Sequence, residues 1–187
     1  MTLREMMEAR REALGIHEFG FVPTKKIVAS RMVREICKQN SCGGYGKTWA
    51  CPPGVGTLEE CQAKMAAWDT VFVFTTRHEL EDSFDWEGMT AGKKAHDAVT
   101  PGVVDFFRSL IPETMVLASE GCARCQVCTY PDAPCRFPDK LHPSIESYGV
   151  EVNVLARSAH VRYNNGPNTV TFFSCIFFNG DADQEVG

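Results

Sequence analysis

Four cysteines between residues 122 and 135 constrain this chain more than any other feature. The segment GCARCQVCTYPDAPCRFP has the spacing C-x2-C-x2-C-x6-C, formed by Cys122, Cys125, Cys128 and Cys135. A cubane 4Fe–4S cluster needs thiolates at four corners. Two consecutive two-residue spacers place three of them around one face, and a more distant cysteine supplies the fourth. The spacing therefore predicts a 4Fe–4S cluster at these four residues.

A structural zinc ion is the rival interpretation, since four cysteines also make a tetrahedral site. Zinc sites usually pair two C-x2-C knuckles across a longer loop, whereas three cysteines at successive intervals of three are typical of cubanes. The last spacer, TYPDAP, is longer than in bacterial ferredoxins. Arg136 directly follows a predicted ligand, and we expect it to donate to the cluster; Arg124 is either a similar donor or a solvated side chain.

A second group of cysteines, with the looser spacing C-x4-C-x8-C-x9-C, comprises Cys37, Cys42, Cys51 and Cys61. The glycine-rich loop around Cys42 has too few apolar residues to order itself, so we expect a metal to hold it. Cys61 follows a predicted helix start and is equally explained as a ligand or as a core residue. With four thiolates this second cluster would suit electron transfer. With three, one iron would be open to a substrate.

Composition limits the class of protein and the cellular compartment in which these predicted clusters would occur. The chain has 187 residues, nine cysteines and a formal net charge of −5. It contains neither a basic run of the kind that nucleic-acid surfaces need nor an apolar stretch of membrane-spanning length. The charged N-terminus does not resemble a signal peptide, so we expect a cytoplasmic protein, where disulfides are disfavoured. The ninth cysteine, Cys175, lies in an apolar strand and is expected to be a core residue.

The hydrophobic pattern predicts one iron–sulfur domain over residues 1–187, with the cysteine blocks at 37–61 and 122–135. We expect a three-layer α/β sheet with flanking helices and long cysteine-rich cluster-binding loops, finishing antiparallel. Thr57 and Glu60 form a capping-box pattern, and Pro101 marks a break or a boundary between helices. Helices are expected over residues 1–14, 29–37, from 57 and about 88–110, and strands over 70–76, 114–118, 150–156 and 170–178, the last two as a hairpin.

Several stretches together resemble a known family. They are YGKTWACPPGVGTLEEC, LASEGCARCQVCTYPDAPCRFP and SIESYGVEV. With them the chain resembles the predicted metal-binding proteins of anaerobic bacteria and archaea catalogued as domain of unknown function 2284. The resemblance matches Cys37, Cys42 and Cys51 to the family's first block and the cysteines from 122 to 135 to its second. It implies metal binding and an anaerobic setting, and no particular reaction.

Two functions follow as hypotheses. The first is electron transfer through one or two 4Fe–4S clusters to a redox partner protein, and neither a GxGxxG nor a GxxxxGK[ST] loop indicates an organic cofactor. The second is an enzyme whose cluster has an open iron that binds or reduces a small substrate. A structural or metal-delivery role is a third, less specific alternative. The sequence leaves open whether the protein is an enzyme.

Overall fold

The computed structural model of the chain describes residues 1–119, 121–122 and 124–186. Its centre is an antiparallel sheet of four strands in the order β1-β2-β4-β3. The strands are β1 (Phe19–Pro23), β2 (Thr70–Glu79), β3 (Met115–Leu117) and β4 (Thr169–Phe178). The two long strands pair over their whole length, from Thr70 opposite Phe178 to Glu79 opposite Thr169.

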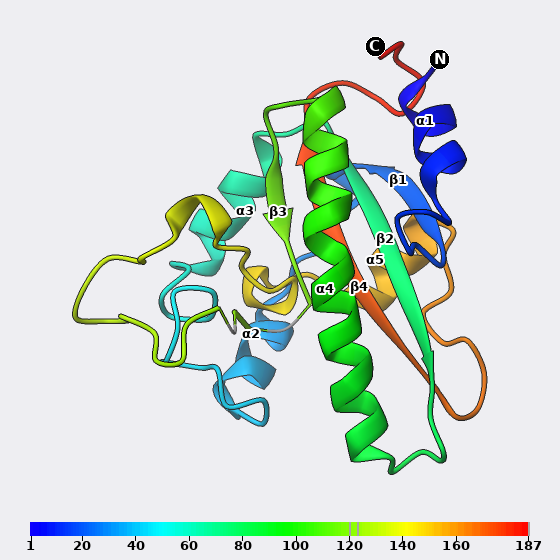
Figure 1. Cartoon of the computed structure of the whole chain (residues 1–187). Coiled ribbons are helices and arrows are strands. Elements are labelled where there is room, and N and C mark those ends of the chain that lie inside the picture. Colours follow the sequence, from blue (N-terminus) through cyan, green and yellow to red (C-terminus); the bar gives the residue numbers. More distant parts are fainter. Residues whose placement is uncertain (120, 123, 187) are drawn as a thin grey trace.

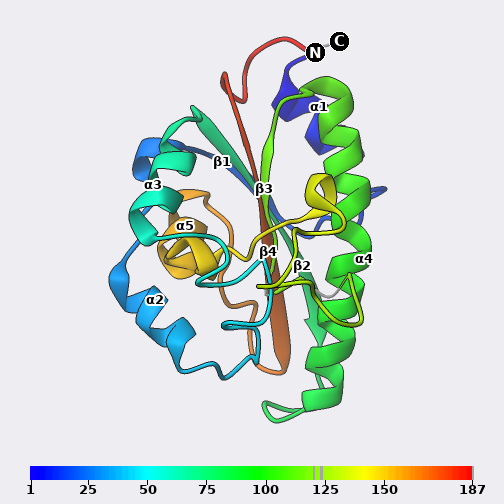
Figure 2. The ribbon, with the colours of Figure 1, turned by 90° about the vertical axis from the view of Figure 1, so that its left-hand side faces the viewer.

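Helices cover both faces of this sheet, as the two ribbon views show (Figures 1 and 2). Helices α1 (Leu3–Arg10) and α4 (Trp86–Leu110) lie on one face. On the other lie α2 (Arg31–Lys38), α3 (Leu58–Ala66) and α5 (Val152–Ser158), together with the short 3-10 helix η3 (Glu146–Tyr148). The described part of the chain is therefore a helix–sheet–helix arrangement, the three layers that the pattern predicts.

Alternation along the long strands divides the apolar side chains between the two layers. Phe72 and Phe74 of β2 pack with Phe107 of α4 on one face. Val71 and Val73 point to the other face and join a cluster that includes residues of α3 and α5. Strand β2 is buried from Thr70 to Thr76, as its continuous apolar run predicts.

The segment from Val152 is a helix, so the predicted strand over 150–156 and its hairpin with 170–178 are wrong. Its apolar residues alternate, which suggested a strand. They also fall on one helical face, where Leu155, Ala156 and Ala159 are buried against the sheet. Strand β4 pairs with β2 along its whole length, and on its other edge β3 pairs with Cys175–Phe177.

Helix α4 runs without interruption through Pro101, where a break or boundary was expected. The proline removes one backbone hydrogen bond, but the same helical face stays buried on both sides of it. His96 and Thr100 precede the proline on this face, and Val103 and Phe107 follow it. The packing of α4 against the sheet therefore outweighs the tendency of Pro101 to break the helix.

Buried His96 joins α4 to both long strands through side-chain hydrogen bonds. Its Nδ1 lies 2.8 Å from Oγ1 of Thr76, and its Nε2 lies 2.8 Å from Oγ of Ser174. Burial, reinforced by the charge of Lys93, lowers the pKa of His96 to about 4. The histidine is therefore neutral in the folded protein at neutral pH.

This histidine should make the fold less stable in mild acid. In the unfolded chain His96 is protonated below pH about 6.5, whereas in the folded protein it is protonated only below about pH 4. Between pH 7 and 5 the free energy of unfolding should fall by about 2 kcal/mol through this residue. Urea unfolding across this range should show a shallower pH slope in His96→Asn, and His160→Asn, at an exposed position, controls for loss of a histidine. Equal slopes in the two variants would contradict the assignment.

Candidate metal centre

The cysteines from 122 to 135 lie on the long loop that follows β3. All four are half-buried, and they line one small pocket together with residues that include Trp49 and Phe137. The backbone N–H of Phe137 donates to Sγ of Cys135 at 3.4 Å. The loop thus brings four sulfur atoms to one place and supplies a backbone donor to one of them.

Arg136 braces this loop. Its Nη1 donates to the carbonyl oxygen of Val127 at 2.8 Å, which fixes the chain between Cys125 and Cys128. The arginine also lines the same pocket as the cysteines. Arg124 lines it too and is exposed. The expectation that Arg136 donates to a cluster stays a prediction; in the structure its side chain donates to the loop backbone.

Three cysteines of the first block gather where α2 ends and the next loop begins. Cys37 is in the last turn of α2, and Cys42 and Cys51 lie on the loop that follows. A Cβ atom on Gly44 would lie 3.0 Å from Sγ of Cys51 and 3.8 Å from Sγ of Cys42. The backbone at Gly44 therefore lies so close to both sulfur atoms that a larger residue at this position would collide with the sulfur of Cys51.

Burial raises the pKa of both Cys37 and Cys51, with a further contribution from the carboxylate of Glu146. Reactive, nucleophilic cysteines have lowered pKa values, so these thiols are not prepared for nucleophilic attack. A metal is the usual agent that deprotonates such thiols, because it binds the thiolate directly.

Cys61 stands apart from these three. It is fully buried in the core cluster that includes Met65, and its pKa is raised by burial. Nη1 of Arg34 lies 3.7 Å from its Sγ, and the same guanidinium donates to the backbone oxygens of Ser147 and Gly56. The described groups that shift its pKa are charged side chains near α3, with none of the other cysteines among them.

The structure brings the two cysteine blocks side by side, which their separation in sequence did not reveal (Figures 1 and 2). A Cβ atom on Gly121 would lie 3.2 Å from Sγ of Cys51, and Cys122 is close enough to raise the pKa of Cys51. Trp49 links the loops directly. Its Nε1 donates to the oxygen of Ala133 at 3.1 Å, and its ring meets Tyr130 edge-on at 4.9 Å.

A comparison with protein-family models matches residues 20–178 to the family described as "Predicted metal-binding protein (DUF2284)". The chain belongs to this family. Searches of the curated proteins and of the solved structures found no match. Metal binding is therefore the property that family membership supports.

The donors of this DUF2284 protein are cysteine thiols, which suit a metal or an iron–sulfur cluster. Cys122 and its three partners line one small pocket, and the loop passes close to the sulfur atoms of Cys42 and Cys51 at Gly44. The buried hydroxyl of Thr48 lies near enough to lower the pKa of Cys51 and is a potential donor to its sulfur atom.

Two negative findings concern the described residues alone. Among them, no three His, Cys, Asp or Glu side chains converge tightly enough to enclose a single metal ion. None of the described helices is both long and apolar enough to cross a bilayer.

A pocket of about 570 Å³, here called the cysteine pocket, opens beside the first block. Cys37, Cys42 and Cys51 line one side of it. Met32 and Ile36 of α2 form an adjoining wall with exposed fractions of 63% and 55%. Other lining residues come from η3, from the start of α5, from β4 and from the loop between α5 and β4, and include Glu146, Glu151, Tyr163, Phe172 and Phe173.

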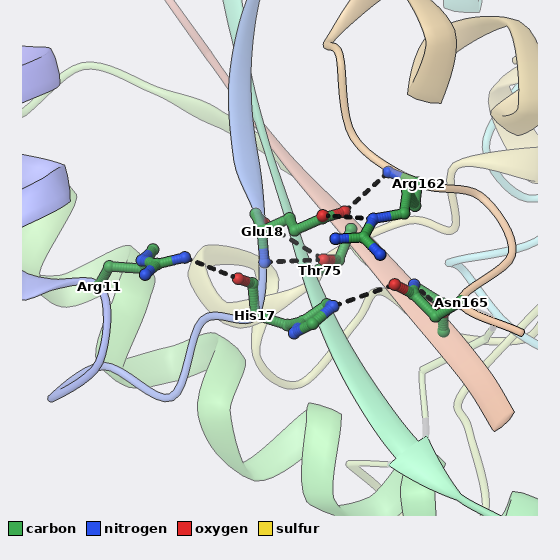
Figure 3. Close-up of polar contacts among 7 residues, drawn as sticks. Arg11, His17, Glu18, Thr75, Arg162 and Asn165 are labelled. Carbon is green, nitrogen blue, oxygen red and sulfur yellow. Dashed lines mark hydrogen bonds and ion pairs between the residues drawn. The ribbon is translucent and has the colours of Figure 1, made fainter.

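A polar network holds the loop that carries Tyr163 (Figure 3). Arg162 forms an ion pair with Glu18 at 3.0 Å, and its backbone N–H donates to the same carboxylate. Asn165 contacts His17 at 3.1 Å and donates to Thr171 of β4. The wall of the cysteine pocket at Tyr163 is therefore anchored to the segment before β1.

Sequence analysis missed the cysteine pocket and its acidic residues. Glu146 lies within SIESYGVEV, one of the stretches that carry the family resemblance, so a signal was present. Met32, Val33 and Ile36 repeat at helical spacing, which normally indicates a core face. In α2 no residue is buried, and this face lines a cavity instead.

Proposed function

We propose that this protein binds two 4Fe–4S clusters and transfers electrons to a redox partner protein in the cytoplasm of an anaerobic organism. Cys122, Cys125, Cys128 and Cys135 would hold one cluster, and Cys37, Cys42 and Cys51 would supply thiolates to the other. The observation that supports this most is the proximity of the two blocks at Cys51 and Gly121. Two redox groups at adjoining sites suit the relay of single electrons.

When bound, such clusters supply one-electron transfer, and a cluster with one non-cysteine iron also supplies a Lewis-acidic position. The chain's own residues would position them. Thr48 and the N–H of Phe137 are donors beside ligand sulfur atoms. Val127 and Phe137 expose 74% and 45% of their surface next to the second block, which offers a partner an apolar contact.

The iron and sulfide content of anaerobically purified protein tests this proposal. We expect brown protein with about eight irons and about eight sulfides per chain, two cubanes' worth. Electron paramagnetic resonance of the reduced protein should show two interacting centres, because the blocks adjoin. About four irons in fully loaded protein would refute the second cluster. Colourless protein with stoichiometric zinc and no sulfide would refute both.

An enzyme is the second candidate, and the cysteine pocket favours it. The structure brings three cysteines to the pocket wall and places Cys61 in the core, hydrogen-bonded to Arg34. A first cluster with only three protein thiolates would face a cavity whose volume lies within the range of small-molecule sites.

Cys61→Ser discriminates between these candidates. Retention of about eight irons and an unchanged spectrum, with a modest loss of stability from the altered core, would exclude Cys61 as a ligand and favour the enzyme. Iron analysis and electron paramagnetic resonance measure this, and Cys175→Ser is the matched control for a buried thiol. Loss of the first cluster in Cys61→Ser alone would show four-thiolate ligation and favour the electron carrier.

A further inference from the structure

We propose that the cysteine pocket binds a small organic cation, an amine or ammonium compound with a flat apolar body. The inference deepens the second candidate function, because it names the class of ligand that would reach the first cysteine block. It relies on the proposed clusters only for the chemistry at the sulfur atoms. The charge and shape of the other walls are properties of the side chains described above.

The apolar part of the ligand is indicated by the walls. Met32 and Ile36 present flexible apolar surface on one side, and Phe173 lies at the β4 side; the ring of its neighbour Phe172 lies on the other face of the sheet, beside His96. The ring of Tyr163 stacks on Phe173 at 5.8 Å with an angle of 27° between the ring planes. Tyr163 is itself anchored through its neighbours Arg162 and Asn165, so an aromatic wall is preformed. Aromatic and thioether side chains favour a flat apolar ligand.

The charge of the ligand is indicated by the acidic residues. Among the described residues that line the pocket, Glu146 and Glu151 are acidic and none is a lysine or an arginine. Arg34 of α2 is engaged with Cys61 and with two backbone oxygens. An anion such as a phosphate ester would meet repulsion here, whereas a cation would be attracted.

Three probes of similar shape and different charge test this inference: phenethylammonium, 2-phenylethanol and 3-phenylpropionate. Isothermal titration calorimetry of the anaerobically purified full chain should show at least tenfold tighter binding of phenethylammonium than of 3-phenylpropionate, with the alcohol between them. Glu151→Gln should reduce that charge preference several-fold and leave the alcohol's affinity unchanged. Glu12→Gln, at an exposed glutamate outside the pocket, is the matched control. Tyr163→Ala should weaken all three probes by a similar factor.

Equal affinity for the cation and the anion, or no binding of any probe, would overturn the inference. So would a charge preference that is unchanged in Glu151→Gln. Iron and sulfide content, measured on the same samples, separates this result from the proposed function. Loaded protein without charge preference refutes the ligand class alone. Protein without clusters refutes the proposed function, and the titration still decides the ligand class because both glutamates remain.

Discussion

Cys125→Ser is expected to lose about four of about eight irons and to unfold at a markedly lower temperature than the wild type. The cysteine is central to the run of three closely spaced thiols, and the loop around it contributes few buried apolar side chains. Metal-binding free energy therefore contributes directly to the folding of this part of the chain. Iron and sulfide analysis, with thermal unfolding followed by circular dichroism, measures both effects.

Cys175→Ser is the matched control for the loss of a thiol. Cys175 is 1% exposed and lies in β4 opposite Val73, among apolar neighbours. A hydroxyl there should cost stability through packing and desolvation, and the iron content should stay at its wild-type value. If Cys175→Ser lost as much iron as Cys125→Ser, Cys175 would belong to the ligand set and the assignment of Cys135 would fail.

Local sequence patterns were sufficient to predict a helix or strand where the packing around the segment favours the same conformation. Thr57 and Glu60 form the predicted capping box, with both reciprocal hydrogen bonds present, and α3 begins where the pattern places it. The apolar run from Thr70 is a central strand because helices cover both of its faces. In each case a short segment contained enough information to specify its own conformation.

The conformation of the segment from Val152 could not be predicted from its local sequence. Its alternating apolar residues are compatible with a strand and with a helix, and the choice depends on how the segment packs in the fold. In the structure it is a helix, and its residues Leu155 and Ala156 are buried in the core. Pro101 is a second case in which tertiary packing decides the conformation. The packing of α4 against the sheet outweighs the helix-breaking preference of the proline.

The candidate site likewise has features that local sequence predicts and features that depend on long-range packing. The cysteine spacing predicts two blocks of candidate ligands, and the structure places Cys61 of the first block in the core, apart from Cys37, Cys42 and Cys51. The approach of Cys51 to Gly121, and the recruitment of Glu146 and Tyr163 to the same cavity, depend on how distant segments pack. The apolar stripe of α2 borders the same pocket, and only the fold shows this.

Gly44→Val is expected to prevent assembly of the first cluster while the second remains, leaving about four irons per chain. The added Cβ would lie 3.0 Å from Sγ of Cys51, closer than real Cβ contacts normally allow, and the branched methyl groups would crowd Sγ of Cys42 as well. The loop would have to move away from the sulfur atoms that it must bring together. Iron and sulfide analysis shows the loss, and the surviving signal of the second cluster shows that the variant is folded.

Gly43→Asn is the control within the same loop. Gly43 has a φ of 76°, which asparagine tolerates better than most residues, and nothing lies within 4 Å of its added Cβ. This variant should therefore keep about eight irons. If Gly44→Val also kept about eight irons, the space beside Cys42 and Cys51 would not be occupied by a cluster, and the thiols of the first block would need another explanation. If both variants lost the same amount, the loop's flexibility rather than its close approach to sulfur would control loading.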